Sequence, residues 1–351
     1  MNLPMLAWIE ITPWHWGGFV LCVIFFLALD LGVFHRRAHV VKFKEALTWT
    51  AIWVTLSLLF AAALVPLRGR QEAVEFVTGY LIELSLSMDN VFVIALIFTY
   101  FRVPPQYQHR VLFWGILGAL VMRGVMIAAG AALIVRFTWL LYVFGAFLIF
   151  TGIKMIFVGN EEVHPEKNPV LRLARKLFPV SGEINNQKFT TRLDGRLALT
   201  PLALVLLMVE TTDLIFALDS IPAIFGVTTK PFIVFTSNVF AILGLRSLYF
   251  VLAGMIDYFR YLKVGLSVVL IFIGVKMLLD PHDQPEKWFQ VKIPTGVSLL
   301  VVGVIILTSV LLSVTAAQRE QKARERKEKK DLNREKREGD ERGKTDPHDK
   351  K

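Results

Sequence analysis

Cysteine is nearly absent from this chain of 351 residues, in which Cys22 is the single one. One cysteine excludes an intrachain disulfide, a CxxC redox motif and a thiolate metal cage. All seven histidines fall outside the long apolar segments, so a zinc or copper site buried there would lack its usual imidazole and thiolate ligands. No Walker-type phosphate-binding loop occurs, so ATP-driven pumping is not indicated. We expect neither a bound cofactor nor enzymatic activity.

Apolar residues, by contrast, dominate the chain. Hydrophobic residues make up 54% of it and the mean hydropathy is +0.54, which is not typical of a soluble domain. About 20 apolar residues cross a bilayer. Nine segments of this kind predict an all-α polytopic membrane protein with about nine transmembrane helices: 17–34, 46–65, 74–100, 110–134, 137–158, 197–225, 231–255, 262–279 and 295–315.

Lysine and arginine are unequally distributed between alternate loops. If the C-terminal tail is cytoplasmic, the cytoplasmic segments carry 29 of these residues, 14 of them in the tail, against six in the opposite loops. The positive-inside rule then predicts an external N-terminus and a cytoplasmic C-terminus. Basic segments facing anionic lipid account for the net charge of +10, so we expect membrane lipid and no nucleic acid as a partner.

Similar motifs predict an internal repeat. The motif LIFTGIKM ends at Met155 and LIFIGVKM ends at Met277, an offset of 122 residues. Each unit contains three spans, and an odd number of spans inverts the second unit, an arrangement that places substrate sites near the membrane midplane. The chain then divides into a two-helix segment 1–73, a first repeat 74–158, a cytoplasmic linker 159–196, a second repeat 197–279, a last helix within 280–317 and a charged tail 318–351.

The linker and the tail have their own local signals. NPVLRLARKLFP mixes apolar and basic residues at helical spacing, which predicts an amphipathic helix at the membrane interface. Asp194-Gly195 is a dipeptide typical of a hairpin turn. The linker is either a structured connection between the repeats or a regulatory or partner surface. The tail carries 14 basic and 10 acidic residues and predicts a solvated helix that extends the last span and then frays.

Acidic residues inside the apolar segments are the candidate functional residues. A charged carboxylate at membrane depth costs at least about 2.5 kcal/mol, so such residues indicate function by default. Two pairs of acids recur with the same six-residue separation, one pair in each repeat, and each pair is followed by a small polar residue. A further acid precedes the second pair. The predicted metal ligands are Glu83, Asp89, Asn90, Glu210, Asp213, Asp219 and Ser220.

Helix geometry predicts which of these side chains share a face. Residues seven apart point the same way, whereas residues six apart differ by about 120°. Glu83 should therefore point with Asn90, and Asp213 with Ser220, while the second acid of each pair turns toward a neighbouring helix. Pro222 predicts a kink or a break in its helix, which would expose main-chain carbonyl oxygens to the site.

The oxygens of carboxylate, amide and hydroxyl groups suit hard divalent cations such as magnesium, calcium and manganese. The residues leave two other roles open. In the first, the acids neutralise Arg123 and Arg246 as structural ion pairs. In the second, they relay protons, which is compatible with cation exchange.

The motifs LSMDNVFVIALIF, GALVMRG and TDLIFALDSIPAIFGVTT resemble those of the TerC family of integral membrane proteins, and the resemblance covers residues 15–315. It implies a protein of the bacterial inner membrane. The family is associated with tellurite resistance, alkaline response and manganese export, and a redox-modulator label has been attached to some members. The resemblance therefore implies manganese as a transported ion, held by the intramembrane acids.

Two functions from different classes follow. The first is a divalent-cation exporter, above all for manganese, that alternates access between the two repeats, with proton coupling as an option. The alternative is a non-transporting component of a tellurite, metal or alkaline-stress resistance or redox-modulating complex, in which the linker and tail matter more than the acids. Either function is compatible with a homo-oligomer or a stress-complex partner. An intramembrane hydrolase using an aspartate pair has no supporting motif.

Overall fold

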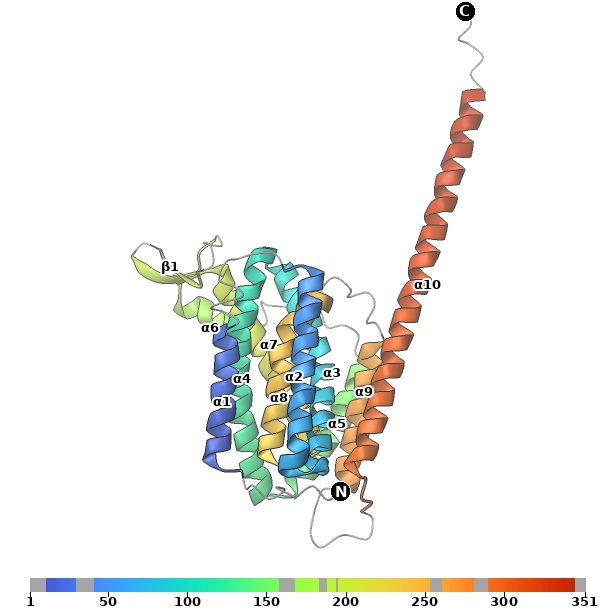
Figure 1. Cartoon of the computed structure of the whole chain (residues 1–351). Helices are drawn as coiled ribbons and strands as arrows, with labels where there is room; N and C mark the ends of the chain where they lie inside the picture. Colours follow the sequence, from blue (N-terminus) through green and yellow to red (C-terminus); the bar gives the residue numbers. More distant parts are fainter. Residues whose placement is uncertain are drawn as a thin grey trace, which may run out of the picture.

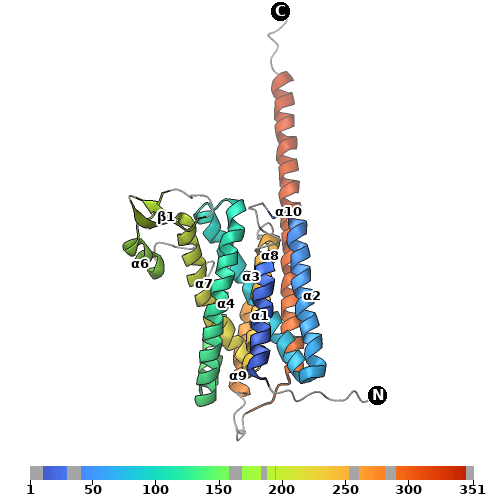
Figure 2. The same cartoon turned by 60° about the vertical axis from the view of Figure 1, so that its left-hand side comes forward.

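The computed structural model describes residues 11–29, 41–157, 168–182, 188–193, 195–252, 261–280 and 290–344. Within these ranges the chain forms ten helices and one two-stranded hairpin (Figures 1 and 2). The helices are α1 (Pro13–Leu29), α2 (Phe43–Arg68), α3 (Arg70–Tyr100), α4 (Pro105–Arg136), α5 (Leu140–Phe157), α6 (Pro169–Leu177), α7 (Pro201–Phe225), α8 (Pro231–Leu252), α9 (Leu262–Leu279) and α10 (Thr295–Lys344).

Eight of these helices are long and apolar enough to cross a membrane: α2, α3, α4, α5, α7, α8, α9 and the first half of α10. They correspond to eight of the nine predicted spans, and the predicted all-α polytopic architecture is confirmed. The remaining span corresponds to α1, an apolar helix of 17 residues. Its predicted continuation to residue 34 lies outside the described residues.

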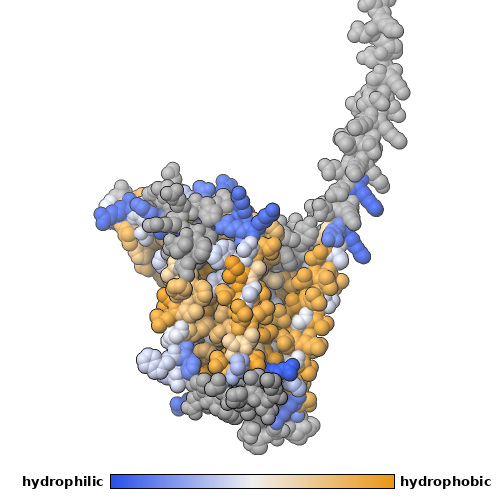
Figure 3. Space-filling model, in the orientation of Figure 1, coloured by the Kyte–Doolittle hydropathy of each residue, from blue (hydrophilic) through white to orange (hydrophobic). Residues whose placement is uncertain are grey.

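The helices form one bundle in which α8 is the most deeply buried span. Helix α3 packs against α2, α7 and α8, α4 packs against α7 and α8, and α5 packs against α9. Helix α10 packs on α3 and α9 and then projects beyond the bundle; we call this end the tail side and the opposite end the far side (Figures 1 and 2). Hydrophobic residues cover the middle of the visible face, with hydrophilic residues toward both ends, as a bilayer requires (Figure 3).

Helices α5 and α9 approach each other closely enough for their backbones to touch. A Cβ atom at Gly145 would lie 2.9 Å from the carbonyl oxygen of Gly274, and one at Gly152 would lie 2.8 Å from that of Ser267. Small residues permit this packing between membrane helices. The 122-residue offset relates Gly145 to Ser267 and Gly152 to Gly274, so it exchanges the two contacts. A two-fold relation between the repeats would produce this exchange, and the full inverted arrangement stays a prediction.

Helix α7 runs without interruption from Pro201 through Pro222 to Phe225. The predicted break at Pro222 is therefore wrong. The proline lies in the last turn, where it removes only the hydrogen bond to the carbonyl of Leu218 and the helix has almost ended. Broken-helix carbonyl oxygens at this position are not available to a site.

The linker contains the predicted helix and hairpin. Asn168 caps α6 by accepting hydrogen bonds from the backbone nitrogens of the second and third following residues, at 2.9 Å and 3.2 Å. Strands β1 (Thr190–Leu193) and β2 (Arg196–Leu199) pair antiparallel, and Gly195 has the positive φ of +75° that a tight turn favours. Both elements lie beside the tail-side end of α7 (Figures 1 and 2). The tail continues α10 as a helix to Lys344.

Candidate functional site

Arg123 lies in the interior of the bundle and is 1% exposed. Its guanidinium joins α4 to two other helices. Nε and Nη2 donate to the two carboxylate oxygens of Asp213 on α7, at 3.1 Å and 2.9 Å. Nη1 donates to Glu83 on α3 and, at 3.2 Å, to the hydroxyl of Ser220 on α7. Two carboxylates from the two predicted repeats therefore meet at one cation.

This arrangement solves the problem of a charge inside the membrane. A guanidinium keeps its proton in proteins, and an unpaired charge in a low-dielectric interior is very costly. The two parallel hydrogen bonds to Asp213 form the strong bidentate geometry of an arginine–carboxylate pair. Pairing of the acids with Arg123, one of the roles that the sequence left open beside metal binding, is observed. Asp213 and Ser220 share a face, as predicted, because both contact the same guanidinium.

Several buried oxygens on α3 and α7, the helices that carry Glu83 and Asp213, have no hydrogen-bond partner among the described residues. They are Glu83 Oε2, Ser87 Oγ and Asn90 Oδ1 on α3, and Glu210 Oε2 on α7. Positions 83, 87 and 90 follow one face of α3 at helical spacing. The Glu210 carboxylate lies directly against Gly118 of α4, where no side chain separates the helices. Each unmatched buried polar group costs about 1–3 kcal/mol, so four of them call for a functional explanation.

The second acid of each predicted pair has a different neighbour. Asp89 lies close enough to Lys263, at the start of α9, for their charges to interact. Asp219 lies close enough to Thr151 and Lys154, both on α5, to interact with their side chains. Both acids thus turn toward a neighbouring helix, as the helical geometry predicted. Each of them interacts with a residue of the third helix of the opposite predicted repeat.

The seven predicted ligands therefore do not form a single cluster. Glu83, Asp213 and Ser220 meet at Arg123, and Glu210 lies near enough to Asp213 for their charges to interact. Among the described residues, no three His, Cys, Asp or Glu side chains are placed to hold a metal ion. The guanidinium occupies the position between the two carboxylates that a bound cation would need. Metal binding by these residues stays a prediction and requires Arg123 to move.

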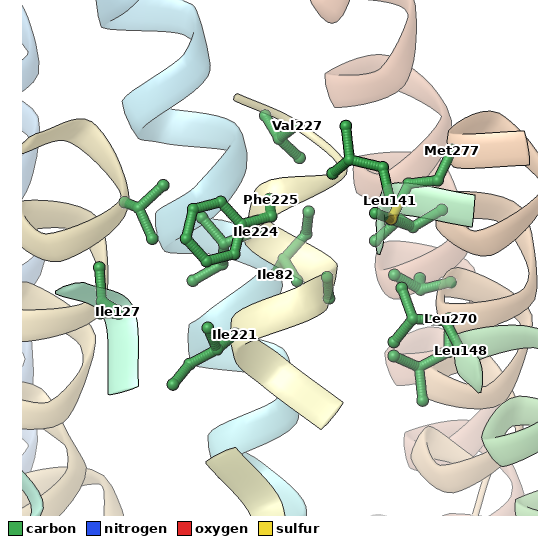
Figure 4. Close-up of a cluster of buried hydrophobic side chains, with 14 of the residues drawn as sticks. Ile82, Ile127, Leu141, Leu148, Ile221, Ile224, Phe225, Val227, Leu270 and Met277 are labelled. Carbon is green, nitrogen blue, oxygen red and sulfur yellow. The ribbon is translucent and has the colours of Figure 1, made fainter. Parts of the chain in front are cut away.

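Hydrophobic clusters lie on both sides of the site. Toward the far side, Ile82 and Ile221, the sequence neighbours of Glu83 and Ser220, belong to a buried cluster that extends to α5 and α9 (Figure 4). Toward the tail side, a second buried cluster joins α3, α4, α7 and α8 around Ile94. The charged group is thus enclosed between two apolar layers, as in an occluded site.

A match of residues 68–321 to the family model described as "Integral membrane protein TerC family" decides the classification. The chain belongs to the TerC family. The matched region contains α3 to α9 and all seven predicted ligands. The resemblance seen in the motifs is confirmed.

Individual relatives of this TerC chain are similar over most of their length. It is 54% identical over 303 residues to the "Uncharacterized membrane protein STKORF319" of Myxococcus xanthus, covering 86% of this chain and 92% of the relative. It is 50% identical over 310 residues to the "Putative membrane-bound redox modulator Alx" of Escherichia coli K12, covering 86% and 94%. An "Uncharacterized membrane protein" of Rickettsia bellii is 39% identical over 299 residues, covering 85% and 96%. No solved structure matches this TerC chain.

A second charged group, which the sequence analysis did not single out, lies on the far side of this TerC bundle. Lys230, between α7 and α8, has its Nζ 3.2 Å from both Glu72 Oε1 and Glu75 Oε2 at the start of α3. Thr228 donates to Glu75 at 2.8 Å, and Arg68 pairs with Glu72 at 2.7 Å. We call these five residues the far-side ion cluster. The sequence contained a signal for this cluster: two carboxylates three residues apart at the start of an apolar helix, and one lysine in a short loop.

Proposed function

We propose that this TerC protein exports a divalent metal cation by alternating access between its two three-helix repeats, and that manganese is the substrate. The observation that carries the proposal is the meeting of Glu83 and Asp213 at Arg123 inside the bundle, with unmatched oxygens beside them. Carboxylate, amide and hydroxyl oxygens suit manganese, magnesium and calcium alike. The choice of manganese rests on the association of the TerC family with manganese export.

Charge balance supports a divalent ion over a monovalent one. When ionised, Glu83, Asp213 and Glu210 carry three negative charges and Arg123 carries one positive charge, which leaves a net charge of minus two. One divalent cation neutralises this group. Two protons neutralise it equally well, so exchange of one cation for two protons keeps the site neutral in both states. A neutral site avoids most of the cost of an uncompensated charge in the low-dielectric interior.

The guanidinium of Arg123 and a metal ion compete for the same carboxylate oxygens. In the observed conformation its guanidinium takes the carboxylate oxygens that the metal ion needs. Binding of the metal ion requires the guanidinium to leave at least one of the two acids, and release of the metal ion allows it to return. Because arginine stays protonated, this competition persists over the physiological pH range.

The enclosure of the site fits the closed intermediate of an alternating-access cycle. The two apolar clusters separate the acids from both ends of the bundle. Opening toward the far side would also separate α3 from the α7–α8 connection and would break the ion pairs of Lys230 with Glu72 and Glu75. We therefore propose the far-side ion cluster as the outer gate, with the tail side facing the cytoplasm as the positive-inside rule indicates.

A second candidate function is a membrane component of a stress or redox-modulating complex that transports nothing. The name of the Escherichia coli relative, "Putative membrane-bound redox modulator Alx", suggests a redox role. Within these 351 residues Cys22 is the single thiol, so a dithiol–disulfide cycle inside the chain has no second partner. Helix α10 continues from Arg319 to Lys344, beyond its candidate membrane span. Ion transport does not require this extension, and that observation favours the second candidate.

The deciding experiment measures manganese flux into proteoliposomes loaded with a metal-quenched dye. We expect wild-type protein to give saturable flux, and Glu83→Gln and Asp213→Asn to give none at equal incorporation. Glu45→Gln, in the first turn of α2 and outside the site, is the matched carboxylate control and should keep wild-type flux. Wild-type flux through both site variants would overturn the proposed site. Absence of flux from the wild type, together with an unchanged manganese content in exporter-deficient cells, would favour the second candidate.

A further inference from the structure

Asn238 of α8 is completely buried, and neither its amide nitrogen nor its amide oxygen has a hydrogen-bond partner among the described residues. A carboxamide offers two donors and an acceptor with two lone pairs, so leaving all of them unmatched is costly. Its neighbours differ, because the hydroxyls of Thr236 and Ser237 donate to carbonyls one turn earlier in their own helix. The polarity of Asn238 thus has no structural use in the observed conformation.

The packing of α8 on α4 places Asn238 level with Arg123. Val234, one turn before Asn238 on α8, belongs to the same buried cluster as Ile127, one turn after Arg123 on α4. Ile242, one turn after Asn238, belongs to the same buried cluster as Ala119, one turn before Arg123. Asn238 is the midpoint of residues 234–242 on α8, and Arg123 is the midpoint of residues 119–127 on α4. A Cβ atom at Gly124, which follows Arg123 directly, would lie 3.4 Å from the ring of Phe235, one turn before Asn238. This contact and the shared clusters place Asn238 and Arg123 in one layer of the bundle.

The packing of α8 on α3 gives a second, independent placement. A Cβ atom at Gly79 would lie 2.9 Å from the hydroxyl of Ser237, so α3 and α8 touch at this level. Glu83 is one turn further along α3 than Gly79, and Asn238 follows Ser237 directly. Oε2 of Glu83, the carboxylate oxygen without a partner, thus belongs to the same region as the unmatched carboxamide.

We propose that Asn238 is a further ligand of the transported cation. Its Oδ1 supplies a neutral oxygen beside the carboxylates of Glu83 and Asp213, and its Nδ2 donates to the unmatched oxygen of Glu83 in the metal-bound state. The proposal rests on the proposed transport function and extends it, because the ion is then held by α3, α7 and α8 together. An amide oxygen adds a ligand of the kind that manganese, magnesium and calcium accept without changing the charge balance of the site.

The test uses full-length purified protein and manganese chloride as the probe. The variants are Asn238→Leu, which removes both polar atoms at similar volume, and Asn238→Ser, which keeps one oxygen and guards against a folding defect. Ser237→Ala is the matched control, since that hydroxyl bonds within its own helix. Two quantities are measured: the manganese concentration that half-saturates flux, and the manganese-dependent rise in the unfolding temperature in detergent.

We expect Asn238→Leu to raise the half-saturating concentration about 10- to 100-fold, as the loss of a metal-site partner does, and to remove the rise in unfolding temperature. Asn238→Ser should lie between Asn238→Leu and the wild type, and Ser237→Ala should match the wild type. Wild-type values of both quantities for Asn238→Leu, or for Asn238→Ser if the leucine variant does not fold, would overturn the assignment of Asn238. If the wild-type protein shows neither manganese flux nor a manganese-dependent rise in unfolding temperature, the proposed transport function itself is overturned.

Discussion

Arg123 binds both carboxylate oxygens of Asp213, with donor–acceptor distances of 2.9 Å and 3.1 Å, in the interior of the helix bundle. Asp213 is the central residue of α7. The pair connects α4 of the first predicted repeat to α7 of the second, and the contact of Arg123 with Glu83 adds α3. A charged group of this kind is retained inside a membrane only where its cost is offset by partners, and its position makes it sensitive to any relative movement of the two repeats.

Removal of the Arg123 charge should destabilise the protein strongly. Arg123→Gln leaves Glu83 and Asp213 buried without their shared cation, and breaking a buried pair in this way costs about 3–5 kcal/mol. The triple variant Arg123→Gln, Glu83→Gln and Asp213→Asn removes all three charges and should recover much of the loss. Thermal unfolding in detergent measures both. Equal unfolding temperatures for Arg123→Gln and the wild type would show that the acids are not stabilised by this arginine.

The second acid of each predicted pair, Asp89 or Asp219, should also be needed for export. Asp89 and Asp219 each interact with a helix of the opposite repeat, so they connect the repeats away from Arg123. Asp89→Asn and Asp219→Asn should each abolish manganese export while the protein still inserts in the membrane. Cellular manganese in a strain without other exporters is the measurement, at matched expression. Normal export by both variants would remove these two acids from the proposed site.

Loss of the Lys230 charge should open the far side. Lys230→Gln removes both ion pairs that hold the α7–α8 connection against Glu72 and Glu75. A cysteine placed at the fully buried Ile224, in a Cys22→Ser background, should then react faster with a membrane-impermeant thiol reagent. Lys292→Gln, a lysine substitution outside the far-side ion cluster, is the control. Unchanged labelling in Lys230→Gln would rule out a gating role for the cluster.

The close contact between α5 and α9 should not tolerate a side chain. In Gly145→Ala the new methyl group would lie 2.9 Å from the backbone oxygen of Gly274, and overpacking of this kind typically costs about 1–3 kcal/mol. Gly18→Ala in α1 meets no atom within 4 Å and is the control. Thermal unfolding of the two variants should therefore differ. A stability of Gly145→Ala equal to that of Gly18→Ala would mean that the helices separate at no cost.

Deletion of the tail should separate the two candidate functions. A chain ending at residue 317 keeps the membrane-spanning part of α10 almost complete and all the residues of the proposed site. If the protein is an exporter, manganese flux should remain within about twofold of the wild type, since no part of the ion path is removed. Loss of the stress phenotype with full retention of flux would assign the tail a separate partner role. Loss of flux in a correctly inserted protein would contradict a tail-independent transporter.

Four residues in and near the site show which structural features a local sequence pattern can predict. The prediction for Asp213 and Ser220 was correct because residues seven apart on one helix share a face whatever surrounds them. The prediction of a break at Pro222 was wrong because the effect of a proline depends on how much helix follows it. Asn238 was not singled out, since a neutral amide in an apolar segment is conspicuous only when its surroundings leave it without a partner.

The sequence by itself determined the all-α membrane architecture and the approximate positions of eight membrane-crossing helices, the amphipathic helix α6, the hairpin turn at Gly195 and the presence of acids at membrane depth. These features follow from the length of apolar runs, from turn chemistry and from the cost of a charge in lipid, all of which are local. Only the tertiary structure decided that Glu83 meets Asp213 rather than Asp89, that Arg123 lies between them, and that Lys230 pairs with Glu75 at the start of α3. The rotation of each helix and its choice of neighbours decide such contacts, because they depend on the packing of the whole bundle.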